Sequence, residues 1–223
     1  MYLIDWIQRA IIKQMKYNGY FITIEGVEGA GKTTQIRLLA EALNDNVIVT
    51  REPGGTPISE KVRELFLSDD TISATTELLL IGAARTQHVT ELILPALEDG
   101  KTVICDRFSD ATIAYQGYRK GIDLKLVEQV NDIATNGLIP DVTFLLDLPP
   151  ELGLQRKQDS SEPLTRLEFE TITQHEKVRE GYLSVANAQP ERVLVIDARL
   201  DVNIIHHKLL SEIKNRLQFR NVK

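Results

Sequence analysis

The sequence has only one cysteine, Cys105, no surplus of basic residues and no long apolar run. A single cysteine excludes an intrachain disulfide and any metal site built from several cysteines, and it is typical of a reducing compartment. The 26 basic residues are outnumbered by 32 acidic ones, and this formal net charge of −6 argues against broad binding of nucleic acid. No apolar stretch approaches the roughly 20 residues that a membrane-spanning helix needs. We therefore expect a cytoplasmic protein that binds neither nucleic acid nor a membrane.

The composition is that of a globular protein, with 43% hydrophobic and 26% charged residues, and 223 residues are enough for one domain. Five short apolar runs rich in Val, Ile or Phe predict buried strands, and segments with helical spacing separate them. This alternation predicts an α/β fold in three layers: a five-stranded parallel sheet flanked by helices, with the ligand crevice at the carboxyl ends of the strands. The predicted strands are residues 20–24, 47–50, 102–105, 142–146 and 193–196.

Capping signals predict where several helices begin and end. Thr56 before Pro57 is typical of a helix start, and Asp123 predicts the start of a helix that Asn136 and Gly137 end. A long apolar helix is expected over residues 75–97, disturbed at its proline, and further helices are expected near residues 36–43, 165–187 and 201–217.

Residues 1–18 lie outside the alternating pattern and predict an N-terminal extension to a single domain of residues 19–223. Ile4, Ile7 and Ile11 share one face of a helix. We expect a short amphipathic helix that packs on the domain or extends from it, with a membrane-surface or partner helix as the alternative.

The strongest motif is Gly-Val-Glu-Gly-Ala-Gly-Lys-Thr at residues 26–33, which matches the phosphate-binding pattern G-x-x-x-x-G-K-[ST]. It directly follows a predicted strand and opens a predicted helix, as the pattern requires. The glycines let the backbone direct N–H groups at phosphate oxygens, while Lys32 should reach the β- and γ-phosphates and the Thr33 hydroxyl should bind Mg²⁺. We therefore expect a P-loop NTPase-type fold. The residues expected to bind ATP here are Gly26, Val27, Glu28, Gly29, Ala30, Gly31, Lys32, Thr33 and Thr34.

A second anchor is the end of the third predicted strand, where Asp106 and Arg107 follow an apolar run. A carboxylate at this edge of the sheet can hold Mg²⁺, and an adjacent arginine suits bidentate recognition of phosphate. The alternative is a surface ion pair at a strand end. Cys105 is interpreted as a small core residue. The histidines share no metal-ligand spacing and are interpreted as structural or surface residues, namely His88, His175, His206 and His207.

The class of nucleotide-binding protein follows from further motifs. A switch GTPase needs Asp-x-x-Gly after its metal strand and Asn-Lys-x-Asp for guanine, and neither pattern occurs in this chain. A mechanical or transport ATPase is normally larger and carries a second module. A small kinase is the leading class, and a nucleotide-dependent switch or binding module is the less favoured alternative.

Five further motifs lie between residue 20 and the end of the chain. They are Phe21-Ile22-Thr23-Ile24-Glu25-Gly26, Thr50-Arg51-Glu52-Pro53-Gly54-Gly55-Thr56, Ala83-Ala84-Arg85-Thr86-Gln87, Asp106-Arg107-Phe108 and Ala114-Tyr115-Gln116-Gly117. Through these motifs the chain resembles the thymidylate kinases, nucleoside-monophosphate kinases that make dTDP from dTMP and ATP. The resemblance implies direct, in-line phosphoryl transfer with Mg²⁺ as cofactor, ATP and dTMP as substrates, and a homodimer formed through helices that include the one with Arg85. The alternative within the enzyme class is a kinase for another monophosphate or a nucleoside.

The resemblance also implies roles for individual residues at the acceptor. Arg51 and Arg107 correspond to arginines that bind the acceptor phosphate, and Arg85 corresponds to a donor to the base carbonyl. Thr112 matches a contact to the thymine ring nitrogen, and Tyr115 matches the tyrosine beside C2′ that disfavours a 2′-hydroxyl. The residues expected to bind dTMP are Glu25, Arg51, Arg85, Arg107, Thr112, Tyr115 and Gln116.

In this family a mobile, arginine-bearing lid follows the fourth strand, which places it at about residues 153–168 here. By resemblance, Arg156 packs on adenine, and Arg166 or Lys157 meets the transferring phosphoryl group. The chain has fewer lid arginines than many relatives with a glutamate in the phosphate loop, because Gln158, Asp159 and Ser160 occupy part of this stretch. The expected catalytic residues are therefore Lys32, Arg107, Lys157 and Arg166, and the expected metal ligands are Thr33 and Asp106.

Overall fold

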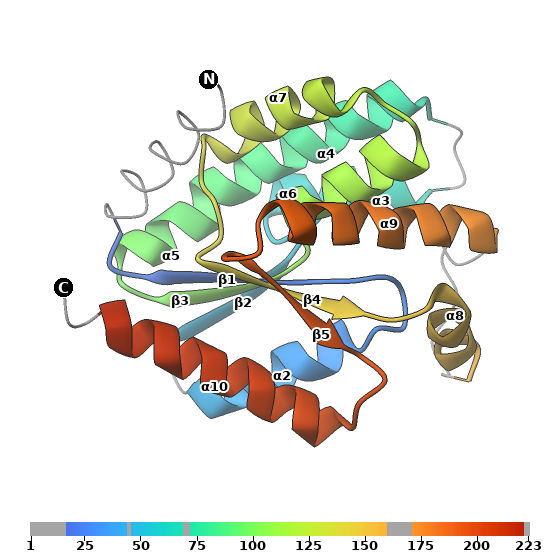
Figure 1. Ribbon diagram of the computed structural model, residues 1–223. Coiled ribbons are helices and arrows are strands. Elements are labelled where there is room, and N and C mark those ends of the chain that lie inside the picture. The colour runs from blue at the N-terminus through green and yellow to red at the C-terminus, as the bar shows by residue number, and fades with distance from the viewer. Residues whose placement is uncertain (1–16, 44–45, 69–71, 160–170, 221–223) are drawn as a thin grey trace.

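The computed structural model describes residues 17–43, 46–68, 72–159 and 171–220. A five-stranded sheet runs through the middle of the molecule, with helices above and below it (Figure 1). Every strand pairing is parallel, and the strand order is β2-β3-β1-β4-β5. These findings confirm the predicted three-layer α/β fold. The strands are β1 (Tyr20–Glu25), β2 (Val47–Arg51), β3 (Thr102–Asp106), β4 (Val142–Asp147) and β5 (Val193–Asp197).

Each strand extends one residue beyond its predicted end, and that residue is charged. Parallel pairing continues through these positions, since Arg51 pairs with Asp106 and Asp147 pairs with Asp197. Because the carboxyl ends of parallel strands meet at one edge of a sheet, the extension brings these charges to the same edge as the phosphate loop.

The helices cover both faces of the sheet. In Figure 1, α2 and α10 lie below the sheet, α4, α5, α6 and α9 lie above it, and α8 lies beside its carboxyl edge. The helices are α2 (Lys32–Leu43), α3 (Pro57–Leu67), α4 (Ala74–His88), η1 (Val89–Ile93), α5 (Leu94–Glu98), α6 (Ser109–Thr112), η2 (Ile113–Arg119), α7 (Leu124–Thr135), α8 (Pro150–Gln158), α9 (Ile172–Ala188) and α10 (Val202–Arg220).

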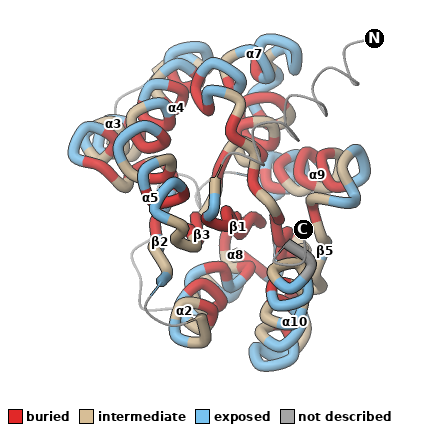
Figure 2. The backbone as a smooth tube through the Cα atoms, turned by 90° about the vertical axis from the view of Figure 1, so that its left-hand side faces the viewer, coloured by how far each residue is buried: buried red, intermediate tan, exposed pale blue. Residues whose placement is uncertain are grey.

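Apolar side chains fill the space on each side of the sheet. One cluster joins strand residues such as Phe144 to Leu39 of α2 and Leu209 of α10, and a second contains Ile93 and Cys105. Buried residues concentrate on the sheet and on the inward faces of the helices (Figure 2). Cys105 is fully buried, as expected.

The predicted capping residues are confirmed. The side chain of Thr56 accepts a hydrogen bond from the Ser59 N–H at the start of α3, and Asp123 accepts one from the Lys125 N–H at the start of α7. Asn136 ends α7 in the left-handed conformation, with φ of 50°. The sequence can predict these capping residues because each one forms its hydrogen bond with a backbone group of the helix end only a few positions away.

The long helix over residues 75–97 is present, but its irregular section precedes Pro95. Residues 89–93 form a π-helical segment in which the N–H of Leu94 donates to the carbonyl of Val89. Proline has no N–H, and its ring clashes with the carbonyl four residues earlier in a regular α-helix. The wider turn before Pro95 accommodates both effects.

Parts of the expected organisation lie outside the described residues. They include residues 1–16 of the expected N-terminal extension and residues 160–170, which hold the first part of the helix predicted over 165–187. Among the described helices, none is long and apolar enough to cross a membrane.

Candidate functional site

The phosphate loop connects β1 to α2 at the carboxyl edge of the sheet. Gly29 adopts φ of +71°, and a Cβ atom there would clash with the carbonyl of Gly153 in α8. Only glycine suits this close approach. The ammonium of Lys32 donates hydrogen bonds to the carbonyls of Gly26 and Val27, both at 3.1 Å, so the lysine lies across its own loop.

Burial and the nearby cation Arg107 together lower the pKa of Lys32 to about 8, against the opposing effect of the negative charges of Asp106 and Glu28. An anion bound in this loop would restore the preference for the charged ammonium. Thr33 is exposed in the first turn of α2, where its hydroxyl is open to a ligand. The residues predicted to bind phosphate therefore lie together, on one loop and on the first turn of the helix that follows it.

Asp106 lies at the carboxyl end of the third strand, where it is expected from the sequence, and its Oδ1 atom is buried without a hydrogen-bonding partner in the described part of the chain. A buried carboxylate oxygen without a donor is costly unless a ligand or cation satisfies it. Carboxylate and hydroxyl oxygens suit Mg²⁺, so Asp106 and the exposed Thr33 fit a magnesium ion that is also bound by phosphates and water. Among the described residues, no group of three or more His, Cys, Asp and Glu side chains could hold a metal alone.

Arg107 follows Asp106 with a left-handed backbone, φ of 67°, which is uncommon outside glycine. Its Nη1 donates to the Tyr182 hydroxyl at 2.8 Å and its Nη2 to Glu28 Oε1 at 3.1 Å. The guanidinium carbon lies 4.9 Å from the centre of the Tyr115 ring. Each terminal nitrogen keeps a further N–H, so Arg107 is fixed in orientation and can still bind an anion.

Glu28 is at the centre of a buried polar cluster rather than on the surface of the loop. It accepts hydrogen bonds from Arg107 and from the Tyr115 hydroxyl, the latter at 2.5 Å, and its Oε2 lies 3.5 Å from Nδ1 of His175. Burial alone would raise the pKa of this carboxyl, but His175, Arg107 and Lys32 hold the pKa well below its usual range. The carboxylate is therefore ionised and orients Arg107 and Tyr115.

Glu25, the last residue of β1, is fully buried. Its Oε1 accepts from the N–H of Phe108 at 2.6 Å, and its Oε2 accepts from the Tyr182 hydroxyl at 2.8 Å. Burial and the negative charge of Asp110 raise the pKa of Glu25 to about 8, against the opposing effect of Arg107. Near neutral pH this carboxyl is mostly protonated. In these contacts Glu25 supports the segment that carries Arg107.

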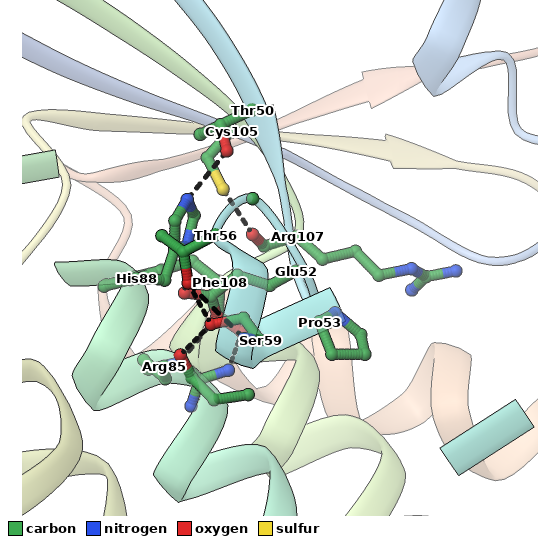
Figure 3. Close-up of polar contacts among 12 residues, drawn as sticks. Thr50, Glu52, Pro53, Thr56, Ser59, Arg85, His88, Cys105, Arg107 and Phe108 are labelled. Carbon is green, nitrogen blue, oxygen red and sulfur yellow. Dashed lines mark hydrogen bonds and ion pairs between the residues drawn. The ribbon is translucent and has the colours of Figure 1, made fainter. Parts of the chain in front are cut away.

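Arg85 is buried in the middle of α4, where it pairs with a carboxylate from the turn after β2. Its Nε donates to Glu52 Oε2 at 2.6 Å, and the other oxygen of Glu52 lies 2.9 Å from Nδ1 of His88. Nε2 of His88 lies 2.7 Å from the Thr50 hydroxyl. In Figure 3 these groups gather beside the ends of β2 and β3, and the side chain of Arg107 extends away from them. Burial would raise the pKa of Glu52, but Arg85 and His88 lower it.

The other donors of Arg85 face the segment after β3. They bond to Thr112 Oγ1 at 2.9 Å, Asn131 Oδ1 at 2.6 Å and the Phe108 carbonyl at 2.9 Å. A guanidinium has five N–H donors, so four of them are used within the protein and one on Nη2 remains. The structure thus brings Arg85 and Thr112 together. Gln116, also expected at the base, is buried and donates to Glu77 at 2.7 Å.

Arg51 ends the edge strand β2 and is half exposed. Its Nη2 lies 2.9 Å from each carboxylate oxygen of Glu60 in α3. Although Arg51 pairs with Asp106 in the sheet register, its side chain bonds to Glu60 and not to Arg107. Its expected role at the acceptor stays a prediction.

The predicted lid begins in α8, beside the phosphate loop. Nη1 of Arg156 donates to the carbonyl of Ala198 at 3.1 Å and lies 3.4 Å from that of Gly29, so this arginine bridges the phosphate loop and the segment after β5. Lys157 lies in the last turn of the same helix. Arg166 lies outside the described residues. The assignments of these three cations stay predictions.

Two side chains of the site, Glu52 and Tyr182, were given no role from the sequence, and His175 was interpreted only as a structural or surface residue. Glu52 stood in a motif that carries the resemblance, but its partner Arg85 is 33 positions away. Tyr182 shares a helical face with Val178 and Val185, which predicts burial, and a buried tyrosine hydroxyl requires a partner. That signal indicates a polar contact without naming Glu25 or Arg107 as the partner.

Comparisons with known proteins agree with this geometry. A family model described as thymidylate kinase matches residues 24–209. A thymidylate kinase of Geotalea uraniireducens (strain Rf4) is 49% identical over 209 residues, covering 89% of this chain and 98% of that protein. One of Geobacter sp. (strain M21) is 47% identical over 210 residues, covering 90% and 93%. The crystal structure of thymidylate kinase from Ehrlichia chaffeensis aligns with a TM-score of 0.72 at 37% identity, covering 87% of this chain and 98% of the other.

Proposed function

Because the chain belongs to the thymidylate kinase family, we propose that it transfers the γ-phosphoryl group of ATP to the phosphate of dTMP and so forms dTDP and ADP. The observation that carries this proposal is the arrangement of three phosphate-directed features at one edge of the sheet. They are the loop with Lys32, the carboxylate of Asp106 and the guanidinium of Arg107.

The reaction needs little covalent help from the protein. An oxygen of the dTMP phosphate attacks the γ-phosphorus, the bond from that phosphorus to the bridging oxygen breaks, and ADP leaves with the electron pair. A phosphate monoester has its second pKa near 6, so at neutral pH the attacking oxygen already lacks a proton. No general base is required, and positioning and charge neutralisation carry the rate.

The phosphate loop and Lys32 are assigned to ATP. In this proposal the Lys32 ammonium exchanges its bonds to Gly26 and Val27 for bonds to phosphate oxygens, and the negative charge of the phosphates keeps the lysine charged. Thr33 and Asp106 would hold Mg²⁺ together with the phosphates. When bound, the ion neutralises phosphate charge.

At the acceptor, Arg51 and Arg107 are assigned to the dTMP phosphate and the remaining donor of Arg85 to a carbonyl of the base. Thr112 lies 2.9 Å from Arg85, which supports its assignment to the same ring. Tyr115 is held by Glu28, and a rigid ring beside the sugar would exclude a 2′-hydroxyl. Gln116 and Glu25 support these groups from buried positions.

The lid assignments extend the same proposal. Arg156 already spans the phosphate loop and the segment after β5, which supports a position beside the adenine. Arg166 or Lys157 is assigned to the transferring phosphoryl group. Closure of this segment would exclude water, which otherwise competes with the acceptor.

We also propose that the enzyme is a homodimer formed through α4. Leu79 is 57% exposed on this helix, whereas Leu78 and Ile81 are buried in the single chain. Only the Leu79 face is therefore available to a second copy. The cytoplasmic location and the short amphipathic helix expected within residues 1–18 stay predictions.

A coupled assay of ADP formation tests the function with dTMP, dUMP, dCMP, dGMP and UMP as acceptors. We expect dTMP to have the highest kcat/KM and UMP a much lower one. Loss of the thymine methyl in dUMP removes an apolar contact worth about 1 kcal/mol, or roughly fivefold. Equal efficiency with UMP and dTMP would contradict the assignment of Tyr115, and a better acceptor among the other nucleotides would contradict the proposed substrate.

A further inference from the structure

Glu60, in the first turn of α3, holds both ends of the turn that follows β2. Its carboxylate oxygens each lie 2.9 Å from Nη2 of Arg51, and its Oε1 also accepts the backbone N–H of Gly55 at 2.8 Å. One side chain thus joins the last residue of the strand to the end of the turn four positions later. No role for Glu60 follows from its sequence position.

A second residue of α3 forms a hydrogen bond with the same turn. Nη1 of Arg63, three positions after Glu60 and so on the same side of the helix, donates to the carbonyl of Pro53 at 2.9 Å. Gly54 adopts φ of +135°, and a Cβ atom there would lie only 2.7 Å from Glu60 Oε1. The turn is therefore shaped to receive the Glu60 carboxylate.

Arg51 depends on this contact for its orientation. It lies on the edge strand β2, and 51% of its side chain is exposed, so solvent surrounds much of it. Within the described parts of the chain its Nε and Nη1 have no hydrogen-bonding partner, and both bonds of this side chain are made by Nη2. One terminal nitrogen is thus fixed by Glu60, while the rest of the guanidinium is available to an anion.

We infer that Glu60 is a positioning residue that orients Arg51 for the phosphate of the acceptor nucleotide. An exposed arginine samples many rotamers, and ordering it when the acceptor binds would weaken binding. Glu60 orders Arg51 before the acceptor arrives. Its own negative charge is shared by Arg51 and the Gly55 N–H, so it does not face the incoming phosphate unpaired. The inference rests on the proposed function, in which Arg51 binds that phosphate.

The test compares Glu60→Ala, Glu60→Gln, Arg51→Ala and the double variant, with kcat and the KM values for dTMP and ATP measured for each. Glu64→Ala is the matched control, since it removes the same charge from an exposed position of the same helix. We expect Glu60→Ala to raise the KM for dTMP about tenfold, with kcat and the KM for ATP within about twofold of wild type. Glu60→Gln keeps an oxygen that can accept the Gly55 N–H, and this variant should raise the KM for dTMP only about threefold.

The double variant separates positioning from support of the turn. If Glu60 acts through Arg51, Glu60→Ala should raise the KM for dTMP no further once Arg51 is alanine. The same tenfold increase in both backgrounds would overturn the inference, and so would a lower KM, which would mean that Glu60 competes with the phosphate. An unchanged KM in Glu60→Ala, as in Glu64→Ala, would also overturn it. If Arg51→Ala alone left the KM for dTMP unchanged, the proposed role of Arg51 would be the part that fails.

Discussion

Glu52 and Arg85 form a fully buried ion pair, with Nε of Arg85 2.6 Å from Glu52 Oε2 and neither side chain more than 4% exposed. The pair joins the turn after β2 to the middle of α4. Together with three further hydrogen bonds of Arg85, it leaves a single N–H of this arginine without a partner among the described residues. The base contact expected from the family therefore depends on one donor, whose direction is set by four internal hydrogen bonds.

Removing either partner of this pair should destabilise the protein strongly. Glu52→Ala leaves the Arg85 guanidinium buried with an uncompensated charge and takes a hydrogen bond from His88, and we expect the free energy of unfolding to fall by about 3–5 kcal/mol. Urea denaturation measures this change. Glu41→Ala, which breaks the exposed pair of Glu41 with Arg37, should cost no more than about 0.5 kcal/mol. Equal, small losses in both variants would contradict the buried network.

Lys32→Ala should lower kcat by about 10²- to 10³-fold while the protein stays folded. The variant loses the cation expected at the β- and γ-phosphates. Its fold should survive, because among the residues that the structure describes the lysine donates only to the carbonyls of Gly26 and Val27 in its own loop. Thermal unfolding is the control. A variant that melts like wild type and keeps near-full activity would exclude Lys32 from catalysis.

Glu25 should make the stability of the protein fall as the pH rises. Its pKa is about 8 in the folded chain, because of burial and Asp110, against an ordinary value of 4.5. Between these two values the folded chain holds a proton that the unfolded chain has released. The free energy of unfolding contributed by this group is therefore present below pH 4.5 and lost by about pH 8.

The matched variant is Glu25→Gln, which resembles the protonated carboxyl and cannot ionise. We expect the melting temperature of this variant, relative to wild type, to increase steadily across that pH range. Subtracting the wild-type curve of melting temperature against pH from that of the variant removes the contributions of other titrating groups. Parallel curves would show that Glu25 is ionised in the folded protein throughout.

Substitutions of the three predicted lid cations should have different effects on kcat and KM. Lys157→Ala or Arg166→Ala should lower kcat by on the order of 10³-fold with little change in the KM for dTMP, since that interaction forms only with the transferring group. Arg156→Ala should mainly raise the KM for ATP. Values within about twofold of wild type in all three variants would leave Lys32, Arg107 and Mg²⁺ to neutralise the charge alone.

The sequence predicted the features that depend on neighbouring residues. Strand patterns, the cap at Thr56 and the phosphate loop each involve groups only a few positions apart, and all are present. The predicted strand bounds stopped one residue short because the apolar pattern stops before the backbone pairing does. The long helix was expected to be disturbed at Pro95, and its π-helical segment lies just before this residue, because the proline acts on the preceding carbonyls.

The internal support of the site was not predictable in the same way. Tyr182 meets Glu25 from 157 positions away, and Arg107 meets Glu28 from 79. Such contacts depend on how α9 and the sheet pack, and no local pattern encodes them. The family resemblance identified Arg85 as a functional arginine, but only the structure shows that Glu52 and Asn131 hold it.

The most direct test of the account follows the phosphorus by ³¹P NMR in a reaction of the full chain with Mg²⁺, ATP and dTMP. We predict that dTDP and ADP form in equal amounts, that no inorganic phosphate appears, and that ATP stays intact when dTMP is omitted. Release of inorganic phosphate at the same rate with and without dTMP would contradict the account, because it would show a nucleotide hydrolase in place of a kinase.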